Sequence, residues 1–333
     1  MIRYSPLADQ VITLQADGNK IKVTQQGVSL GYYSKVSCTT DKGGIKVLKP
    51  LNPDLPEWAY SGSIFFTAQK GILKIINEVE EVDYLAGVLR GETGKEKSVA
   101  FYEAMAIMAR TYACYYGNRH KAEGFNLCDQ THCQVYKGHF PYRPWFDAAR
   151  STHGLVMKDR DGVCAEAVFH ANCGGQTARA SAVWKNDIRG CERVLDPFCL
   201  NSKGAVWEKR FGKDEFIRKA GITEIEWNTW KSYSDSLSLF CYAGLERPDL
   251  LILGDERINP VRWREKFGLR SAWFDVEIVG EEVIFSGRGF GHGVGMCQEG
   301  AMEMGRYGCT PEEILEHYFR GMRVVPLDDS MVE

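Results

Sequence analysis

The sequence lacks a strong net charge, a long apolar run, an internal repeat and any low-complexity segment. Its formal net charge is −3 over 333 residues, without the basic stripe of a nucleic-acid-binding protein, so nucleic acid is excluded as the main partner. No run of 18 apolar residues occurs, and we expect no membrane-spanning helix. The first ten residues, MIRYSPLADQ, lack the charged and apolar regions of a signal peptide, as a trimmed chain also would. With 44% hydrophobic and 26% charged residues, the composition is that of a globular protein.

Cysteine, by contrast, is frequent. The eleven cysteines stand at positions 38, 114, 128, 133, 164, 173, 191, 199, 241, 297 and 309. Most are isolated in the sequence, which is typical of buried free thiols. The exceptions are Cys128 with Cys133, and a looser group at 164, 173, 191 and 199. A mixture of disulfides, a metal site and free thiols fits this distribution.

The local patterns predict a mixed α+β fold. Residues 1–75 read as short strands with Gly and Asp turns, a β-rich N-terminal lobe. The segment 82–92, VDYLAGVLRGE, predicts a short helix led by Asp83. A long apolar helix should follow after Ser98, its N-cap, and stop at Gly117; it is hydrophobic nearly all round and should be buried.

We expect residues 76–333, which include these two helices, to form the core of the protein. Residues 118–150 are rich in loops, and DRDG marks a strand–turn–strand in 151–185. Residues 201–265 are more charged and partly helical, and we interpret them as a peripheral insertion. A second hairpin, SAWFDVEIVGEEVIFSG, leads into the glycine-rich stretch 287–295. In TPEEILEHYFRG, Thr310 and Glu313 form a capping box and Gly321 ends the helix.

The glycine-rich stretch GRGFGHGVG does not match a nucleotide-binding loop, because no acidic ribose partner follows it in a βαβ unit. Two interpretations remain. Alternating glycines let a strand carry an extended ligand against bare backbone, with His292 projecting from a groove wall. Alternatively, the stretch is a bulge that turns the chain, and His292 bonds locally.

Glu92 ends the short helix and precedes a glycine turn. A carboxylate at the mouth of an apolar cleft has a raised pKa, as a general acid requires. The alternative is an ordinary exposed loop glutamate.

Two segments combine cysteine with histidine. CDQTHC supplies Cys128, His132 and Cys133, ligands that suit zinc, with His120 as a fourth from outside the motif. A Cys128–Cys133 disulfide is the alternative. In FHANCGG, His170 and Cys173 could form a nucleophilic pair, but no orienting Asn or Asp can be identified, so we favour a structural loop.

Several motifs together resemble the SpoIID/LytB family. The signature is GRGFGHGVGMCQEGAMEMGRYGCTPEEILEHYFRGM, from residue 287 to 322. INEVEEVDYLAGVLRGE (76–92), ARTYA (109–113), CDQTHCQVYKG (128–138), FHANCGGQT (169–177) and VW (183–184) also match, in the family's order. The sequence departs from the pattern at Thr93-Gly94, where Met-Pro is usual, and at Glu103 and Met105. Cys173 and Cys297 stand where the pattern has serine.

The resemblance implies a peptidoglycan lytic transglycosylase that cuts the β-1,4 bond between N-acetylmuramic acid and N-acetylglucosamine in strands stripped of stem peptides. Glu92 matches the family's catalytic glutamate, and a groove should lie between the buried helix after Glu92 and the glycine strand. Substrate contacts are expected from the following residues: His292, Gln298, Gly291, Gly293, Arg110 and His170.

The resemblance also implies zinc in a structural role at Cys128, His132, Cys133 and His120. The expected partners are glycan strands and other cell-wall hydrolases such as amidases, and the expected location is the cell envelope. A non-catalytic wall-binding protein that modifies an amidase is the alternative function.

Overall fold

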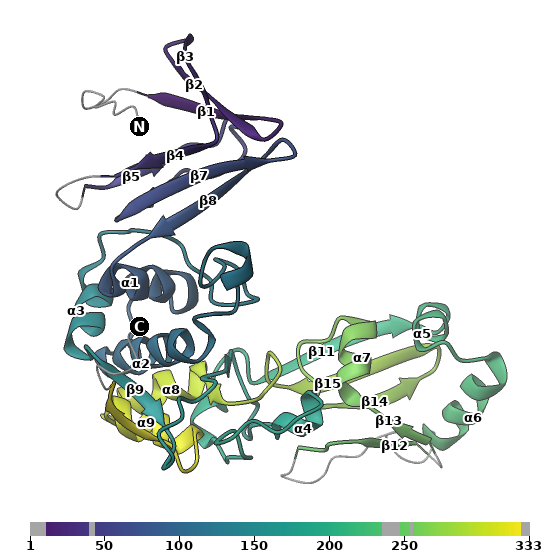
Figure 1. Cartoon of the computed structure of the whole chain (residues 1–333). Coiled ribbons are helices and arrows are strands. Elements are labelled where there is room, and N and C mark those ends of the chain that lie inside the picture. The colour runs from purple at the N-terminus through teal and green to yellow at the C-terminus, as the bar shows by residue number, and fades with distance from the viewer. Residues whose placement is uncertain (1–10, 40–43, 235–246, 254–255, 328–333) are drawn as a thin grey trace. The chain divides into compact units, whose positions relative to one another are not determined.

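The computed structural model describes residues 11–39, 44–234, 247–253 and 256–327 (Figure 1). Within these ranges helices mix with short strands in small sheets, so the predicted α+β class is confirmed. Cys241 and parts of the predicted insertion lie outside the described residues. No helix in the described ranges is long and apolar enough to cross a membrane.

The chain forms two compact units. Unit 1 comprises residues 1–92 and 118–146, and unit 2 comprises residues 93–117 and 147–333, so the chain passes between the units three times. The two units are defined by which residues contact one another. The sequence motifs instead predicted a lobe that ends at residue 75, and that boundary stays a prediction.

Unit 1 consists mainly of antiparallel strands. They form the sheets β1-β2-β3 and β4-β7-β8 and the pair β5-β6. The bounds are β1 Ile12–Asp17, β2 Lys20–Gln25, β3 Val28–Tyr33, β4 Lys35–Cys38, β5 Lys46–Leu48, β6 Trp58–Tyr60, β7 Ser63–Gln69 and β8 Ile72–Glu78. Helix α1 (Glu81–Glu92) and the 3₁₀ turn η1 (Lys121–Glu123) complete the unit, and α3 (Arg143–Ser151) crosses its boundary.

The β-rich lobe folds as its sequence pattern predicts. The DGN turn joins β1 to β2, with Gly18 at a positive φ of 58°. Alternation along β2 turns Ile21 and Val23 to one face. There they pack with Ile64 and Phe66 of β7 in the hydrophobic cluster of this unit.

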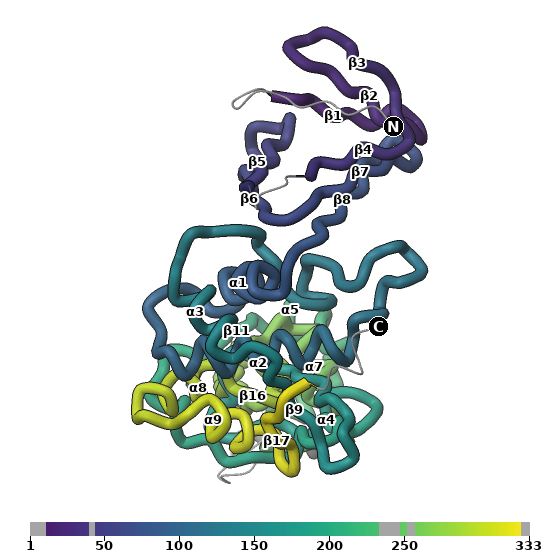
Figure 2. The backbone as a smooth tube through the Cα atoms, turned by 60° about the vertical axis from the view of Figure 1, so that its left-hand side comes forward, coloured from purple at the N-terminus to yellow at the C-terminus, as the bar shows by residue number. Residues whose placement is uncertain are grey.

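In unit 2, helix α2 (Val99–Tyr116) is buried over most of its length, as predicted. Ser98 is its N-cap and its hydroxyl accepts a hydrogen bond from the Phe101 backbone. Strand β9 and helices α8 and α9 lie beside it (Figures 1 and 2). The hydroxyl of Thr111 accepts a hydrogen bond of 2.9 Å from the backbone of Met157, which fixes β9 against the helix.

The remaining elements of unit 2 follow in chain order. They are β9 Leu155–Lys158, β10 Phe169–His170, α4 Ala180–Val183, η2 Pro197–Cys199, β11 Val206–Gly212, α5 Lys213–Ala220, α6 Glu224–Ser234, β12 Leu251–Leu253, β13 Glu256–Ile258, α7 Pro260–Phe267, β14 Phe274–Val279, β15 Glu282–Arg288, β16 Met296–Cys297, α8 Gln298–Arg306, α9 Pro311–Tyr318 and β17 Arg323–Pro326.

The segment predicted as a peripheral insertion contributes to a second hydrophobic core. Its strand β11 pairs with β15, and β15 pairs with β14, in one antiparallel sheet. Phe216 of α5 is fully buried and packs against Trp227, Trp263 and Phe285. Helices α5 and α7 lie against this sheet in Figure 1. The described part of the segment is therefore a packed layer of the unit.

Three predicted boundaries need correction. The DRDG turn is present, but the strand expected after it is reduced to a single bridge between Lys158 and Cys164. Helix α9 has the predicted Thr310–Glu313 capping box, yet it ends at Tyr318 rather than Gly321. Strand β15 ends at Arg288, and residues 289–295 form a loop in place of the predicted glycine strand.

Candidate functional site

Glu92 is the last residue of α1, and one face of that helix is shaped to hold the segment 134–138. Gly87 and Gly91 lie one turn apart, and a Cβ on either would collide with this segment, on the Tyr136 ring or the Val135 carbonyl. Arg90 donates hydrogen bonds of 2.6 and 2.9 Å to the carbonyls of Lys137 and His139. The spacing of the YLAGVLRGE motif is thus explained by close packing within unit 1.

This packing gives Glu92 a defined environment. Its Oε1 accepts a hydrogen bond of 2.9 Å from the backbone N–H of Val135. Burial raises the pKa of Glu92, and the Val135 hydrogen bond and the charge of Lys137 only partly oppose it. A half-buried carboxyl with a raised pKa can hold a proton and donate it, which suits a general acid.

The four predicted metal ligands lie together in unit 1. One donor atom from each of His120, Cys128, His132 and Cys133 lies within 4.8 Å of the other three. Both cysteine sulfurs lie 3.7 Å from Nδ1 of His132. Two thiols and two imidazoles at this spacing fit one tetrahedral zinc ion.

His120 is oriented by a residue that the sequence reasoning missed. Its Nδ1 lies 2.5 Å from Oε1 of Glu123, while its buried Nε2 has no hydrogen-bond partner among the described residues. A carboxylate on one imidazole nitrogen commonly fixes the other toward a metal. The spacing of three residues between His120 and Glu123 was the available signal.

Residues 120–133 carry the four predicted metal ligands and are called the metal loop below; they lead directly into the segment that contacts Glu92. The backbone of Tyr136 donates a hydrogen bond of 3.2 Å to the carbonyl of Asp129, inside the CDQTHC motif. Two residues after Cys133, Val135 donates to Glu92. Ordering the loop therefore also orders the Val135 N–H.

In unit 2, parallel pairing of β10 with β16 joins the FHANCGG motif to the glycine-rich stretch. Phe169 faces Met296 and His170 faces Cys297 in register, and Asn172 bridges to Phe290. The chain's own atoms crowd these glycines. A Cβ at Gly291 would press on the His170 side chain, and one at Gly293 would collide with the Arg247 guanidinium. Close packing of the chain on itself accounts for both glycines, without an extended ligand.

His292 is part of the turn. Its Nε2 lies 2.8 Å from the Phe169 carbonyl, and its Nδ1 accepts a hydrogen bond of 3.1 Å from the Val294 backbone. Burial lowers the pKa of His292 to about 4, so the imidazole is neutral at pH 7. His170 lies edge-on to it at 5.5 Å between ring centroids, and its Nδ1 lies 3.0 Å from the Val294 carbonyl.

Two other predicted substrate residues have contrasting positions. Arg110 is buried in α2 and donates hydrogen bonds of 3.1 Å to the carbonyls of Ala149 and Leu155. These contacts give Arg110 a structural role within unit 2, and its substrate contact stays a prediction. Gln298 is the half-buried first residue of α8. The predicted groove joins residues of both units and stays a prediction.

The alternative Cys173–His170 nucleophilic pair is not supported by the geometry. Cys173 is fully buried, and its sulfur lies 3.1 Å from the Asp196 carboxylate and 3.4 Å from the Cys199 sulfur. Nδ1 of His170 bonds the Val294 carbonyl instead. A sulfur without access to solvent cannot attack a substrate.

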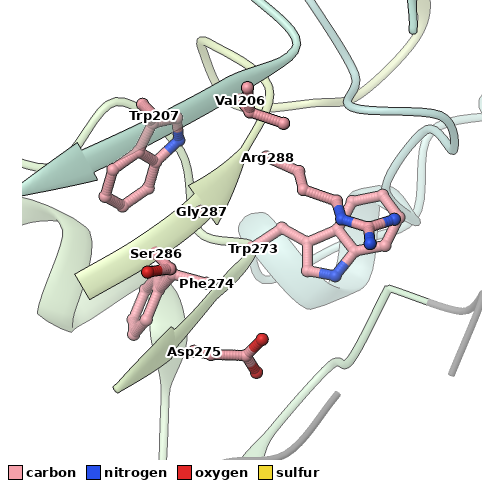
Figure 3. A pocket seen from close by; sticks show the side chains of 8 residues that line it. All are labelled: Val206, Trp207, Trp273, Phe274, Asp275, Ser286, Gly287 and Arg288. Carbon is pink, nitrogen blue, oxygen red and sulfur yellow. The ribbon is translucent and has the colours of Figure 1, made fainter. Parts of the chain in front are cut away.

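A pocket of about 230 Å³ lies on the sheet of unit 2 (Figure 3). Arg288 lies over the indole of Trp273, 5.5 Å from its ring, and the Asp275 carboxylate points into the space. Gly287 is required there because a Cβ would collide with the Trp207 ring. The pocket contains none of the predicted catalytic, substrate or metal residues.

Comparisons with known proteins agree with the motifs. Residues 69–158, which include Glu92 and the metal loop, match the family model described as Stage II sporulation protein, SpoIID. The chain is 25% identical to stage II sporulation protein D of Bacillus amyloliquefaciens over 303 residues, 86% of this chain and 85% of that protein. It is 27% identical to the Bacillus subtilis protein of the same name over 313 residues, 88% and 85% of the two chains. An uncharacterised protein of Brachyspira hyodysenteriae is 26% identical over 271 residues, 80% and 72% of the two chains.

Proposed function

We propose that this protein is a peptidoglycan lytic transglycosylase. Residues 69–158 match the SpoIID family model, and that family has a role in the cell wall during sporulation. The observation that carries the proposal is Glu92, which lies within the matched residues and has a pKa raised by burial.

The chemistry requires one carboxyl group. Glu92 would first donate its proton to the oxygen of the β-1,4 bond as that bond breaks at the muramic acid C1. The C6 hydroxyl of the same sugar would attack C1, and the Glu92 carboxylate would accept the hydroxyl proton. No water is consumed, and the product is a 1,6-anhydro sugar. An attached nucleophile needs no second carboxylate, unlike the water used by hydrolases.

The groups that shift the pKa of Glu92 in the described part of the chain are consistent with this single-carboxyl scheme. They are burial, which raises the pKa, and the Val135 N–H and the Lys137 ammonium, which lower it. Once the proton is donated, the Val135 N–H and the Lys137 charge would stabilise the carboxylate until it accepts the next one.

Zinc would have a structural role in this scheme. His120, Cys128, His132 and Cys133 would hold the ion, and the ordered loop would keep the Val135 N–H in place for Glu92. The proposed substrate is glycan stripped of stem peptides, and the proposed location is the cell envelope. Amidases are the proposed protein partners.

The test is mass spectrometry of stripped glycan strands after incubation with wild type and Glu92→Gln. We expect anhydro-ended products from wild type and a loss of about 10²–10⁴-fold in rate for Glu92→Gln, with glycan binding retained. Glu78→Gln, an exposed glutamate of the same unit, is the matched control.

Three outcomes would contradict the proposal. Reducing-end products would indicate hydrolysis. Full activity in Glu92→Gln would remove Glu92 as the acid. Glycan binding by wild type without any cleavage would favour the alternative, a non-catalytic modifier of an amidase.

A further inference from the structure

A second cluster of metal-ligating side chains lies inside unit 2. Cys173, Asp196, Cys199 and Cys297 are all 0% exposed, and one donor atom from each lies within 4.8 Å of the other three. We propose that these four residues bind a second zinc ion through three thiolates and one carboxylate. The proposal is independent of the lytic activity, because the cluster contains no residue assigned to it.

The spacing of the donor atoms is that of ligands around one ion. Zn–S bonds of about 2.3 Å place two sulfurs of a tetrahedral site ~3.8 Å apart. The Cys173 sulfur lies 3.4 Å from the Cys199 sulfur and 3.1 Å from Oδ2 of Asp196. In a disulfide the two sulfurs would lie about 2.05 Å apart. A disulfide would use two of the three cysteines and would leave the buried Asp196 carboxylate without a cation.

Three distant segments of the chain assemble the cluster. The β10–β16 pairing brings Cys297 beside the loop that carries Cys173. Asp196 caps the 3₁₀ turn η2 through the Phe198 N–H, at 3.1 Å, and Cys199 ends that turn. The strand pairing and the capped turn therefore bring the four side chains together within unit 2.

Backbone N–H groups donate hydrogen bonds to one of the cluster sulfurs. The Cys297 sulfur accepts hydrogen bonds of 3.3 Å from the Cys173 backbone and 3.4 Å from the Gly300 backbone. Such donors stabilise and orient anionic thiolates, which is the form that binds metal.

The carboxylate is oriented in the same way. Oδ2 of Asp196 accepts a hydrogen bond of 3.0 Å from the Tyr318 hydroxyl. A Cβ on Gly300 would collide with both Asp196 and Tyr318, so the glycine makes room for this pair. Asp196 thus has its remaining oxygen positions fixed by outer partners, as ligating carboxylates do.

The buried Arg247 guanidinium can compensate the negative charge of the proposed zinc site. Zinc with three thiolates and one carboxylate leaves an excess of about two negative charges, which burial makes unfavourable unless they are compensated. Arg247 is 4% exposed, its guanidinium packs against Gly293 of the glycine-rich stretch, and its Nη1 and Nη2 have no acceptor among the described residues.

Full burial decides what the cluster can do. No substrate reaches sulfurs that are 0% exposed, so a catalytic thiol is excluded. A closed site with four protein ligands is typical of structural zinc. Cys173 and Cys297 stand where the pattern of the resemblance has serine, so a family member with serine at both positions would lack two of the four ligands.

The experiment must separate this site from the one in unit 1. We would measure zinc by elemental analysis in Cys128→Ser/Cys133→Ser, purified with reductant and zinc and then desalted. We expect one tightly bound zinc per chain. Adding Cys173→Ser/Cys297→Ser should remove it, whereas adding Cys191→Ser, a buried cysteine of the same unit outside the cluster, should not.

X-ray absorption of the zinc in Cys128→Ser/Cys133→Ser identifies the ligands. We expect three sulfurs at about 2.3 Å and one oxygen at about 2.0–2.2 Å. Zinc absent from this folded variant, or a disulfide between cluster cysteines in the peptide map of wild type, would overturn the proposal. If the variant fails to fold, zinc is compared between wild type and Cys173→Ser/Cys297→Ser: a loss of one zinc per chain supports the proposal, and an equal zinc content overturns it.

Discussion

At the scale of single residues, Glu92 links pKa to stability. Burial raises the pKa of its carboxyl, so the folded chain binds this proton more tightly than the unfolded chain. Its contribution to stability is therefore fully present below the unfolded pKa of about 4.3 and is lost as the pH rises through the raised folded value.

Glu92→Gln removes this dependence, because the amide does not ionise and its oxygen can still accept from Val135. We expect the variant to be more stable than wild type at neutral pH, with the difference shrinking as the pH falls toward 4. Denaturant unfolding at several pH values measures it, with Glu78→Gln as control. A constant difference across the pH range would contradict the assigned burial of the charge.

Glu123 offers a second test at this scale. Glu123→Gln keeps the side-chain shape but removes the negative charge beside Nδ1 of His120. Loss of such an outer partner typically lowers metal affinity by about 10–100-fold. Competition with a chelator dye would measure zinc affinity, with Glu78→Gln as control. Unchanged affinity would mean that the charge of Glu123 does not support zinc binding by His120.

At the scale of elements, α1 depends on a glycine face. Gly91→Ala would drive a methyl group into the Val135 carbonyl, displacing the segment that donates to Glu92. We expect cleavage to fall by at least ~10-fold, since misplacing a catalytic group by about 1 Å costs up to 10². Gly212→Ala, where a Cβ has open space, should leave cleavage unchanged. Equal activity in both variants would separate Glu92 from the α1 packing.

Helix caps explain which elements the sequence predicts well. Ser98 and Thr310 mark the starts of α2 and α9 because the bond from hydroxyl to backbone is local. The end of α9 was misplaced by three residues, because the backbone already leaves the helical conformation at Phe319, before Gly321. For the glycine stretch the sequence left a strand and a turn open, and the strand assumed for the groove was wrong. The sequence could not decide because the atoms that pack on these glycines, from His170 and Arg247, come from distant segments.

Some residues of the candidate sites could be predicted from the sequence, and others could not. Motif spacing predicted Glu92 and four metal ligands, and the structure brings those ligands together. Asp196 escaped notice because nothing in its local sequence distinguishes it from a capping residue of a short turn. Its role in the second cluster depends on Cys173 and Cys297, which reach it through the fold rather than through the sequence.

At the scale of the whole molecule, each unit has its own hydrophobic cluster, so we expect their stabilities to be separable. Phe216→Ala should remove about 3–5 kcal/mol from unit 2, because this ring is fully buried among tryptophans. Tryptophan fluorescence would follow the loss. Zinc affinity at His120, Cys128, His132 and Cys133 should not change; a parallel loss of both signals would show one cooperative molecule.

The chain crosses between the two units three times, and this limits how recombination can exchange one unit. Neither unit is a continuous stretch of sequence, since unit 1 resumes at residue 118 after α2 has been contributed to unit 2. A single recombination event therefore cannot exchange one unit for that of another gene. Residues 1–92 transferred alone would bring Glu92 without Val135 or the metal loop. Replacing either unit as a whole therefore needs more than one exchange within the gene.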